Sequence, residues 1–164
     1  MRDADDERWM REALARARDA VRWGDVPVGA AVVRDGVLVA AQANRTVRDQ
    51  DPTAHAETAA IRAAAQSLGR WRLDDCTLVV TLEPCAMCAG AIVLARLARV
   101  VFGAWDEKAG MAGSVGDLLR HPRLNHRPEV RGGVLADDCA AVLREFFSAR
   151  RTGAGALRTD KPAR

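Results

Sequence analysis

Two cysteines form the part of this sequence best suited to bind a metal. Residues 81–88 read TLEPCAMC, so Cys85 and Cys88 lie three residues apart, directly after Pro84. A proline is well placed to open a helix, and residues at i and i+3 share one helical face. The positive end of the helix dipole would also favour thiolates over thiols. We therefore expect Cys85 and Cys88 to bind the same ion.

A histidine upstream supplies the third expected ligand. His55 stands in the segment DPTAHAE, residues 51–57, which is another helix start led by a proline. Structural zinc sites normally have four protein ligands, whereas catalytic sites have three and leave a position for water. The set of His55, Cys85 and Cys88 therefore indicates a hydrolytic centre with one zinc ion.

Glu57 is the expected proton carrier of that centre. It lies two residues from His55, so the two side chains would point to different sides of a helix, and Glu57 is not expected to be a fourth ligand. It could instead take the proton of a zinc-activated water. The combined pattern, His-x-Glu followed by Pro-Cys-x-x-Cys, is the signature of zinc nucleobase deaminases as a class.

Length and composition predict one globular domain. The chain has 164 residues, of which 49% are hydrophobic, enough for a single core. We expect residues 1–151 to form this domain and residues 152–164 to be a basic, disordered tail. No apolar run is long enough to span a membrane, and the charged start does not read as a signal peptide. We therefore expect a cytoplasmic protein, with Cys76 and Cys139 as buried thiols.

Positive charge is concentrated toward the C-terminus. Residues 120–164 include ten Arg or Lys and five Asp or Glu, although the whole chain has a net charge of only +3. This balance indicates a polyanionic partner, but a solvated helix face and a basic tail would explain it equally well. Phe146 and Phe147 are adjacent and cannot share one face of a helix. One should be in the core, and the other could stack on a base.

Hydrophobic periodicity predicts the elements that position these residues. Apolar residues spaced by four predict a helix over residues 6–23 with Trp9, Ala13, Ala17 and Val21 in one stripe. Asp35-Gly36 predicts a hairpin of strands 28–34 and 37–43. Further strands are expected over 77–82, 99–104 and 130–134. Helices are expected from the His55 segment to residue 68, over 85–97 and over 136–151, and a short one with its cap at Ser114 and Asp117.

The order strand, helix, strand over residues 77–104 predicts a right-handed parallel unit with the site at the carboxyl ends of the strands. Asn44 opens a polar loop, residues 44–50, that leads into the His55 segment, so we expect Asn44 to contact a ligand. Asp106 is expected either to accept a hydrogen bond from a ribose 2′-OH or to cap its own loop. His121 and His126 lack ligand spacing, so contact with solvent or nucleic acid is favoured over zinc.

Over residues 9–151 the sequence resembles the bacterial tRNA-specific adenosine deaminases. The zinc core alone is also similar to cytidine, cytosine and guanine deaminases. The tRNA enzymes are favoured by the segment 102–110, by Asn125-His126 and by the Phe pair. The other matching stretches are 27–30, 51–57, 81–91 and 133–139. The chain departs from this family at Thr46, where proline is frequent, and at Trp105, where the family is often polar.

The resemblance implies an α/β fold of three layers, α/β/α, like that of cytidine deaminase, with a mixed five-stranded sheet, and a homodimer. It implies that the wobble adenosine of an arginine tRNA is hydrolysed to inosine. His55, Cys85 and Cys88 would bind zinc, and Glu57 would be the proton shuttle. The resemblance also puts Asn44 against the flipped nucleoside of the tRNA anticodon stem-loop, and we expect Val28, Asp106 and Phe147 to contact the substrate with it.

Three other functions remain open at this point. The first is a zinc deaminase of a free base or nucleoside (guanine, cytosine or cytidine), against which the basic C-terminal third argues. The second is a zinc-stabilised RNA-binding module without chemistry, against which Glu57 and the missing fourth ligand argue. The third is a redox Cys-x-x-Cys protein, which would need neither His55 nor Glu57.

Overall fold

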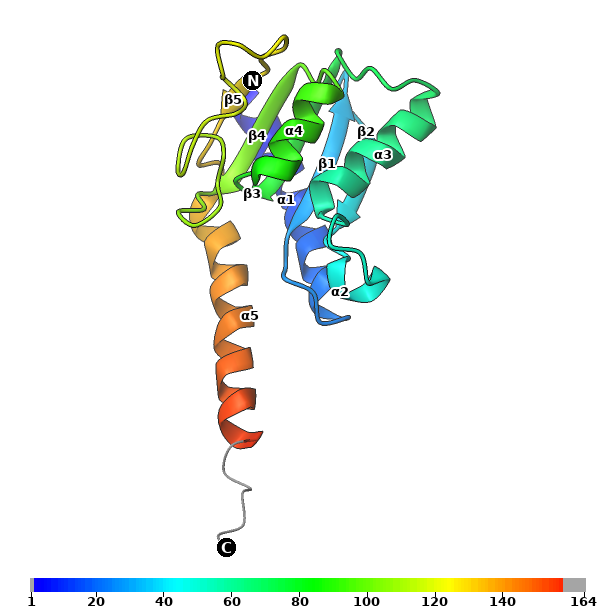
Figure 1. Ribbon diagram of the computed structural model, residues 1–164. Coiled ribbons are helices and arrows are strands. Elements are labelled where there is room, and N and C mark those ends of the chain that lie inside the picture. The colour runs from blue at the N-terminus through cyan, green and yellow to red at the C-terminus, as the bar shows by residue number, and fades with distance from the viewer. Residues whose placement is uncertain (1, 158–164) are drawn as a thin grey trace, which may run out of the picture.

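The computed structural model describes residues 2–157 (Figure 1). Residues 158–164 of the predicted tail lie outside the described residues. The helices and strands follow one another along the chain in the order α1 (Arg2–Val21), β1 (Gly29–Arg34), β2 (Val37–Ala43), α2 (Thr46–Asp49), α3 (Ala56–Leu68), β3 (Cys76–Leu82), α4 (Ala86–Leu94), β4 (Arg99–Ala104), β5 (Glu129–Arg131) and α5 (Ala136–Leu157).

The strands form one mixed sheet in the order β2-β1-β3-β4-β5. β1 is antiparallel to both β2 and β3, whereas β3, β4 and β5 are parallel. The hairpin turn at Asp35 and Gly36 has positive φ at both residues, 50° and 71°, which matches the right-handed twist of the strands it joins. The predicted hairpin and the predicted parallel unit around α4 are both confirmed.

Helices cover both faces of the sheet, which makes three layers. Alternate residues of β3 point to opposite faces. Leu78 and Val80 belong to the core with α3 and α4, and Val79 belongs to the core with Met10 and Leu14 of α1. Figure 1 shows α5 projecting well beyond the sheet. The expected three-layer α/β/α fold with a mixed five-stranded sheet is therefore confirmed.

A carboxylate in α1 ties this helix to two strands. Asp6 is 4% exposed, and it accepts two hydrogen bonds from Arg99 of β4, at 2.6 and 2.8 Å, and one from Arg131 of β5, at 2.5 Å. Burial acts to raise the pKa of Asp6, but the two guanidinium groups lower the pKa below its ordinary value. The charged network therefore ties the start of α1 to β4 and β5.

Several predicted boundaries were wrong. The first helix begins at Arg2 rather than residue 6, and its expected apolar residue Val21 is 45% exposed. Helix α4 ends at Leu94, and β5 is only three residues long. Helix α5 continues past its predicted end at residue 151 to Leu157. These errors lie at element ends, where local pattern carries the least information.

Two local predictions failed because a distant carboxylate decided the structure. The loop predicted over residues 44–50 contains α2, because Asp25 accepts hydrogen bonds from the N–H groups of Val47 and Arg48 at its start. No helix follows Ser114. Its hydroxyl donates to Glu83 instead of capping a helix, and residues 112 and 117 pair as an isolated β-bridge.

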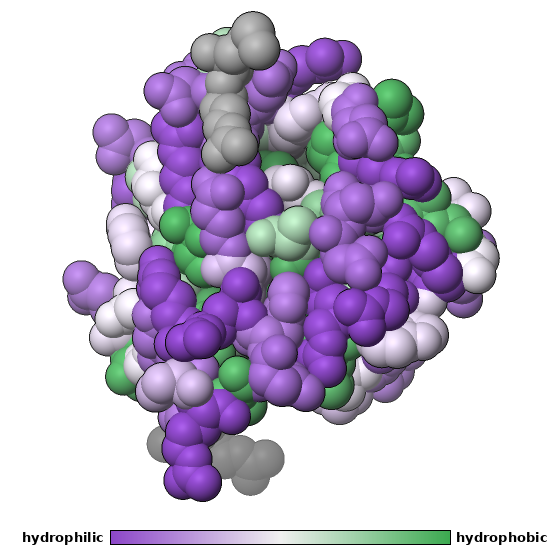
Figure 2. Space-filling view, turned by 90° about the horizontal axis from the view of Figure 1, so that it is seen from above, coloured by the Kyte–Doolittle hydropathy of each residue, from purple (hydrophilic) through white to green (hydrophobic). Residues whose placement is uncertain are grey.

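Hydrophilic residues predominate on the surface seen in Figure 2, with smaller hydrophobic areas between them. Among the described residues, no helix is both long enough and apolar enough to cross a membrane. Cys76 and Cys139 are 0% and 1% exposed and are free thiols, as predicted.

Candidate active site

Two helix N-termini meet beside the carboxyl end of β3. His55 is the N-cap of α3 and Cys85 is the N-cap of α4, and both have extended backbone angles. The predicted helix starts at Pro52 and Pro84 are therefore corrected, since both prolines precede the N-cap residues. The correction leaves the electrostatic argument intact, because the N-cap lies at the positive end of the helix dipole.

The three expected ligands lie together. Nδ1 of His55 is 3.6 Å from Sγ of Cys85 and 3.5 Å from Sγ of Cys88, and the three atoms all lie within 4.8 Å of one another. Among residues 2–157, these three are the side chains of the His, Cys, Asp and Glu types whose donor atoms lie close enough together to hold one metal ion. His126 lies elsewhere, and its Nε2 is 2.7 Å from the carbonyl oxygen of Leu97.

The electrostatics of the three side chains favour a cation. Hydrogen bonds from Cys88 and His55 lower the pKa of the Cys85 thiol to about 4. The bond to Cys85 in turn raises the pKa of His55 and that of the Cys88 thiol. Negative charge is thus concentrated on Cys85 Sγ, opposite the imidazole. Two soft sulfur donors and one imidazole nitrogen are a donor set that fits zinc with one position left for water.

Glu57 is the buried acid beside this group. It is the second residue of α3 and is 4% exposed. Burial raises the pKa of its carboxyl to about 7, although its own backbone N–H and the nearby His55 act in the opposite direction. A carboxyl group with a pKa near 7 can both accept and release a proton at neutral pH.

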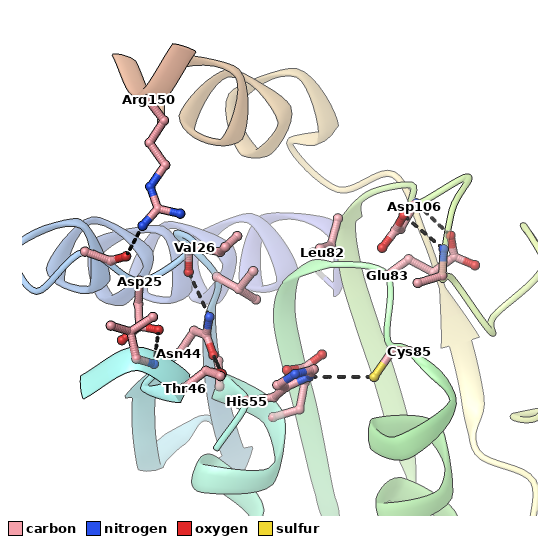
Figure 3. Close-up of a pocket in the computed structure, with 16 residues that line it drawn as sticks. Asp25, Val26, Asn44, Thr46, His55, Leu82, Glu83, Cys85, Asp106 and Arg150 are labelled. Atoms are coloured by element: carbon pink, nitrogen blue, oxygen red, sulfur yellow. Dashed lines mark hydrogen bonds between the residues drawn. The ribbon is translucent and has the colours of Figure 1, made fainter. Parts of the chain in front are cut away.

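A cavity of about 370 Å³ opens onto these residues (Figure 3). His55, Glu57 and Cys85 line it. Val28, Asn44 and Asp106 line it as well, and Figure 3 shows Asp106 on the side of Cys85, across from Asn44. Three of the four residues expected to contact substrate therefore line the same cavity as His55 and Cys85, two of the three expected zinc ligands. Its size is that of a small-molecule site.

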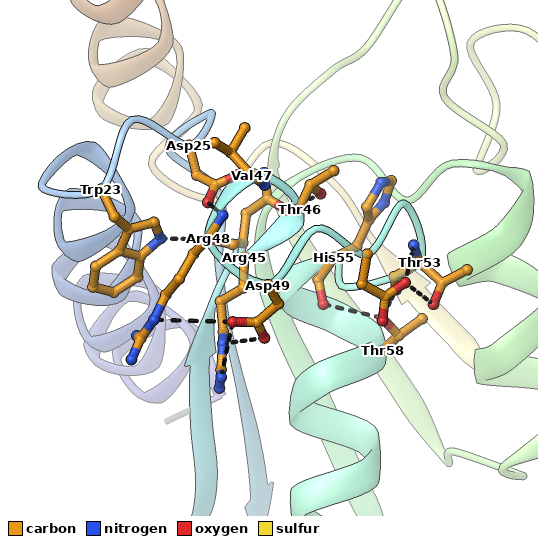
Figure 4. A network of polar contacts seen from close by, with 12 residues as sticks. Trp23, Asp25, Arg45, Thr46, Val47, Arg48, Asp49, Thr53, His55 and Thr58 are labelled. Atoms are coloured by element: carbon orange, nitrogen blue, oxygen red, sulfur yellow. Dashed lines mark hydrogen bonds and ion pairs between the residues drawn. The ribbon is translucent and has the colours of Figure 1, made fainter.

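The Asn44 amide is held by two hydrogen bonds. Its Nδ2 donates to the carbonyl of Val26 at 3.2 Å, and its Oδ1 accepts from the hydroxyl of Thr46 at 3.0 Å. The backbone carbonyl of Asn44 accepts from the indole N–H of Trp23 at 3.2 Å. Figure 4 shows the surrounding polar network, which includes the ion pairs of Arg45 and Arg48 with Asp49. Asn44 is therefore prepositioned at the cavity and is 8% exposed.

The loop after β4 forms the wall that carries Asp106. The Asp106 carboxylate accepts hydrogen bonds from the backbone N–H groups of Lys108 and Ala109 at 3.0 and 3.2 Å. The predicted loop-capping role of Asp106 is thus observed, and both bonds end on Oδ1. Trp105 is 53% exposed, and its ring packs edge-on against Phe102 with 4.7 Å between centroids.

Two buried carboxylates of the cavity wall were not found from the sequence. Asp25 is 1% exposed and caps α2, and Glu83 is 2% exposed and binds the loop of Asp106. Burial acts to raise the pKa of Glu83, but its hydrogen bonds lower the pKa below its usual value. Each partner is at least 22 residues away in sequence, so local spacing carried no signal. Glu83 stood within the predicted metal motif but had no assigned role.

Phe147 lies away from this cavity. Of the adjacent pair in α5, Phe146 is 9% exposed and Phe147 is 43% exposed, so the prediction that one belongs to the core is confirmed. Phe147 lines a separate hollow with five other residues, of which four are cationic: Lys108, Arg144, Arg150 and Arg151. Arg150 also lines the cavity of His55, Glu57 and Cys85, and it donates to the carbonyl of Gly24 at 3.1 Å. The two hollows are therefore neighbours that share Arg150.

The chain is similar to known deaminases over most of its length. Residues 4–151 match the family described as MafB19-like deaminase. The chain is 46% identical to the tRNA-specific adenosine deaminase of Bacillus subtilis (strain 168), with 94% of this chain and 96% of that protein covered. A structure from a study of A-to-I editing by tRNA:A34 deaminases superimposes with a TM-score of 0.80, at 43% identity over 83% of this chain and 99% of the other. The guanine deaminase of Nitrosomonas europaea gives 0.77 at 27% identity, over 87% and 86%.

Proposed function

The chain belongs to the tRNA-specific adenosine deaminases, and from this premise we propose that it converts adenosine to inosine at the wobble position of tRNA with release of ammonia. The observation that carries the proposal is that three donor atoms lie together, and that two of the residues that carry them, His55 and Cys85, line one cavity with a buried acid. The identity to an enzyme of this name over nearly the whole chain supports the same reaction. An arginine tRNA as substrate rests on the family resemblance.

The proposed cofactor is one zinc ion in each subunit, held by His55, Cys85 and Cys88. This set includes no fourth protein ligand, as a catalytic site requires. When bound, zinc would supply the Lewis acidity that lets water lose a proton near neutral pH.

Glu57 is the proposed proton shuttle. Its carboxylate would take a proton from the attacking water and deliver protons to the purine ring nitrogen and then to the departing amino group at C6, as is general for zinc nucleobase deaminases. The burial that raises its pKa to about 7 supports both halves of this role.

We assign Val28 and Asn44 to the flipped base and its ribose. Both line the cavity with Glu57. An adenosine in an anticodon loop is already unpaired, which lowers the cost of bringing it into such a cavity. Asp106 would accept a hydrogen bond from a ribose 2′-OH through Oδ2, the oxygen that does not bind its own loop.

The tRNA anticodon stem-loop is the proposed partner, and α5 is its proposed contact. An exposed aromatic ring beside four cations suits a base stacked on Phe147 and phosphates bound by the Arg and Lys side chains. A homodimer and a cytoplasmic location, where tRNA is found, complete the proposal and rest on the family alone.

A deaminase of free bases is the second candidate, because the guanine deaminase fold is so similar. The test is to incubate the zinc-loaded protein with a stem-loop that carries adenosine at the wobble position, with guanine and cytidine in parallel. We expect inosine from the RNA only, with a KM that rises steeply with salt. Turnover of a free base alone, without salt dependence, would favour the second candidate.

A further inference from the structure

Glu83 lies at the point where the metal segment and the loop of Asp106 meet. Its carboxylate accepts hydrogen bonds from the backbone N–H groups of Asp106, Ala112 and Ser114 at 2.9, 3.0 and 3.0 Å, and from the Ser114 hydroxyl. Two bonds reach each oxygen. An ionised carboxylate accepts about four hydrogen bonds at most, so the side chain is fully used within this loop.

The four donors come from both ends of the loop and close it around the carboxylate. Gly110 lies between them, and a Cβ at this position would overlap Oε2 of Glu83. The neighbouring backbone is tied to the same loop, since the carbonyl of Pro84 accepts from the N–H of Met111 at 2.8 Å. Residues 83–84 thus connect the loop directly to Cys85, the next residue in the chain.

This loop carries one wall of the cavity. Asp106 and Ala109 line it together with His55 and Glu57, and Figure 3 shows Asp106 on the side of Cys85, across the cavity from Asn44. The position of Asp106 relative to the three donor atoms therefore depends on the Glu83 contact.

On the basis of the proposed function, we infer that Glu83 is a positioning residue that fixes the loop of Asp106 for binding the RNA. It contacts neither the reacting atoms nor the three donor atoms. Its contribution should therefore appear in KM rather than in kcat or in zinc content.

The variant Glu83→Gln separates this role from general stability. The amide nitrogen cannot accept hydrogen bonds. If it replaces Oε2, the Ser114 hydroxyl can rotate to accept from it, but the N–H of Asp106 loses its acceptor. If it replaces Oε1, two N–H groups lose theirs. The less costly orientation therefore loosens the chain at Asp106 in particular.

The matched control is Glu107→Gln, which removes the same charge from an exposed position of the same loop. Charge alone would lower KM for a polyanion in both variants. We expect Glu83→Gln to raise KM for the wobble-adenosine stem-loop about tenfold, with zinc content unchanged and kcat within about threefold. Glu107→Gln should leave KM equal to or below that of the wild type. An unchanged KM in Glu83→Gln, or a loss of kcat or zinc instead, would overturn the inference.

Two further measurements keep the test decisive. Gly110→Ala pushes against the same carboxylate from the loop and should raise KM similarly, so it replaces Glu83→Gln if that variant does not fold. Hydrogen exchange at the Asp106 amide should be faster in Glu83→Gln than in Glu107→Gln without any RNA. If the wild type makes no inosine, the proposed function fails, and equal exchange in the two variants would separately refute the anchoring by Glu83.

Discussion

The network at Asp6 allows a stability prediction of definite size. Asp6→Asn keeps the shape of the side chain and removes its charge. Removing one partner of a buried ion pair typically costs about 3–5 kcal/mol. Two features reduce that cost here: Arg131 is 36% exposed, and Arg99 retains Glu129 at 3.0 Å. We therefore expect the free energy of unfolding to fall by about 2–3 kcal/mol.

The assay is urea denaturation with Glu7→Gln as the matched control. Glu7 is the next residue after Asp6 in the same helix and forms an ion pair with Arg11. The side chains of Glu7 and Arg11 are 47% and 62% exposed. Exposed pairs contribute less than about 1 kcal/mol. For a protein of this length a loss of 2–3 kcal/mol should also lower Tm by about 4–12 °C. Equal effects of the two substitutions would refute the reasoning.

The pH dependence of the same difference gives a second check. The pKa of Asp6 in the folded protein is lowered from its ordinary value of 3.8. Its charge therefore stabilises the fold fully above pH 3.8, and this contribution is lost as the pH falls through the lower folded pKa. The gap between wild type and Asp6→Asn should be constant from pH 5 to 8 and should narrow below about pH 3.8. A constant gap down to pH 3 would contradict the account.

The remaining predictions concern the cavity and its RNA face. Glu57→Gln should retain zinc and lower kcat by about 10²–10⁴-fold in an inosine assay; an active variant would exclude the proton role. Cys88→Ala should lose zinc and activity together, and chelation should inactivate the wild type until zinc is restored; activity in a metal-free protein would contradict the site. Asp106→Asn should reduce the preference for RNA over the DNA version of the stem-loop, and an unchanged preference would remove the 2′-OH contact. Phe147→Ala should weaken RNA binding by about 1–3 kcal/mol in a titration that Phe147→Trp leaves near wild type; equal binding by both variants would rule out stacking.

Patterns confined to one or two elements were predictable from the sequence. The turn at Asp35-Gly36 can be predicted from two adjacent residues. The shared site of Cys85 and Cys88 can be predicted because the two residues are separated by less than one helical turn. The pairing of His55 with the cysteines spans 30 residues, yet chemistry identified it, because two thiolates need another ligand to complete a metal site.

Carboxylates that act over long sequence distances were not predictable in this way. Asp25 begins a helix 22 residues later, and Glu83 holds a loop that runs to 31 residues beyond it. Ser114 has good spacing for a capping box with Asp117, but tertiary contact with Glu83 takes its hydroxyl. Local spacing predicts a cap only when no distant group competes for the same donors.

The central claim is that this cavity deaminates the wobble adenosine of a tRNA. The most direct measurement is sequencing of an arginine tRNA, with adenosine at the wobble position, after incubation with the zinc-loaded protein; inosine is then read as guanosine. We expect conversion at the wobble position alone, and none with the Glu57→Gln variant. Conversion at other adenosines, or no conversion by a fully zinc-loaded wild type, would contradict the account.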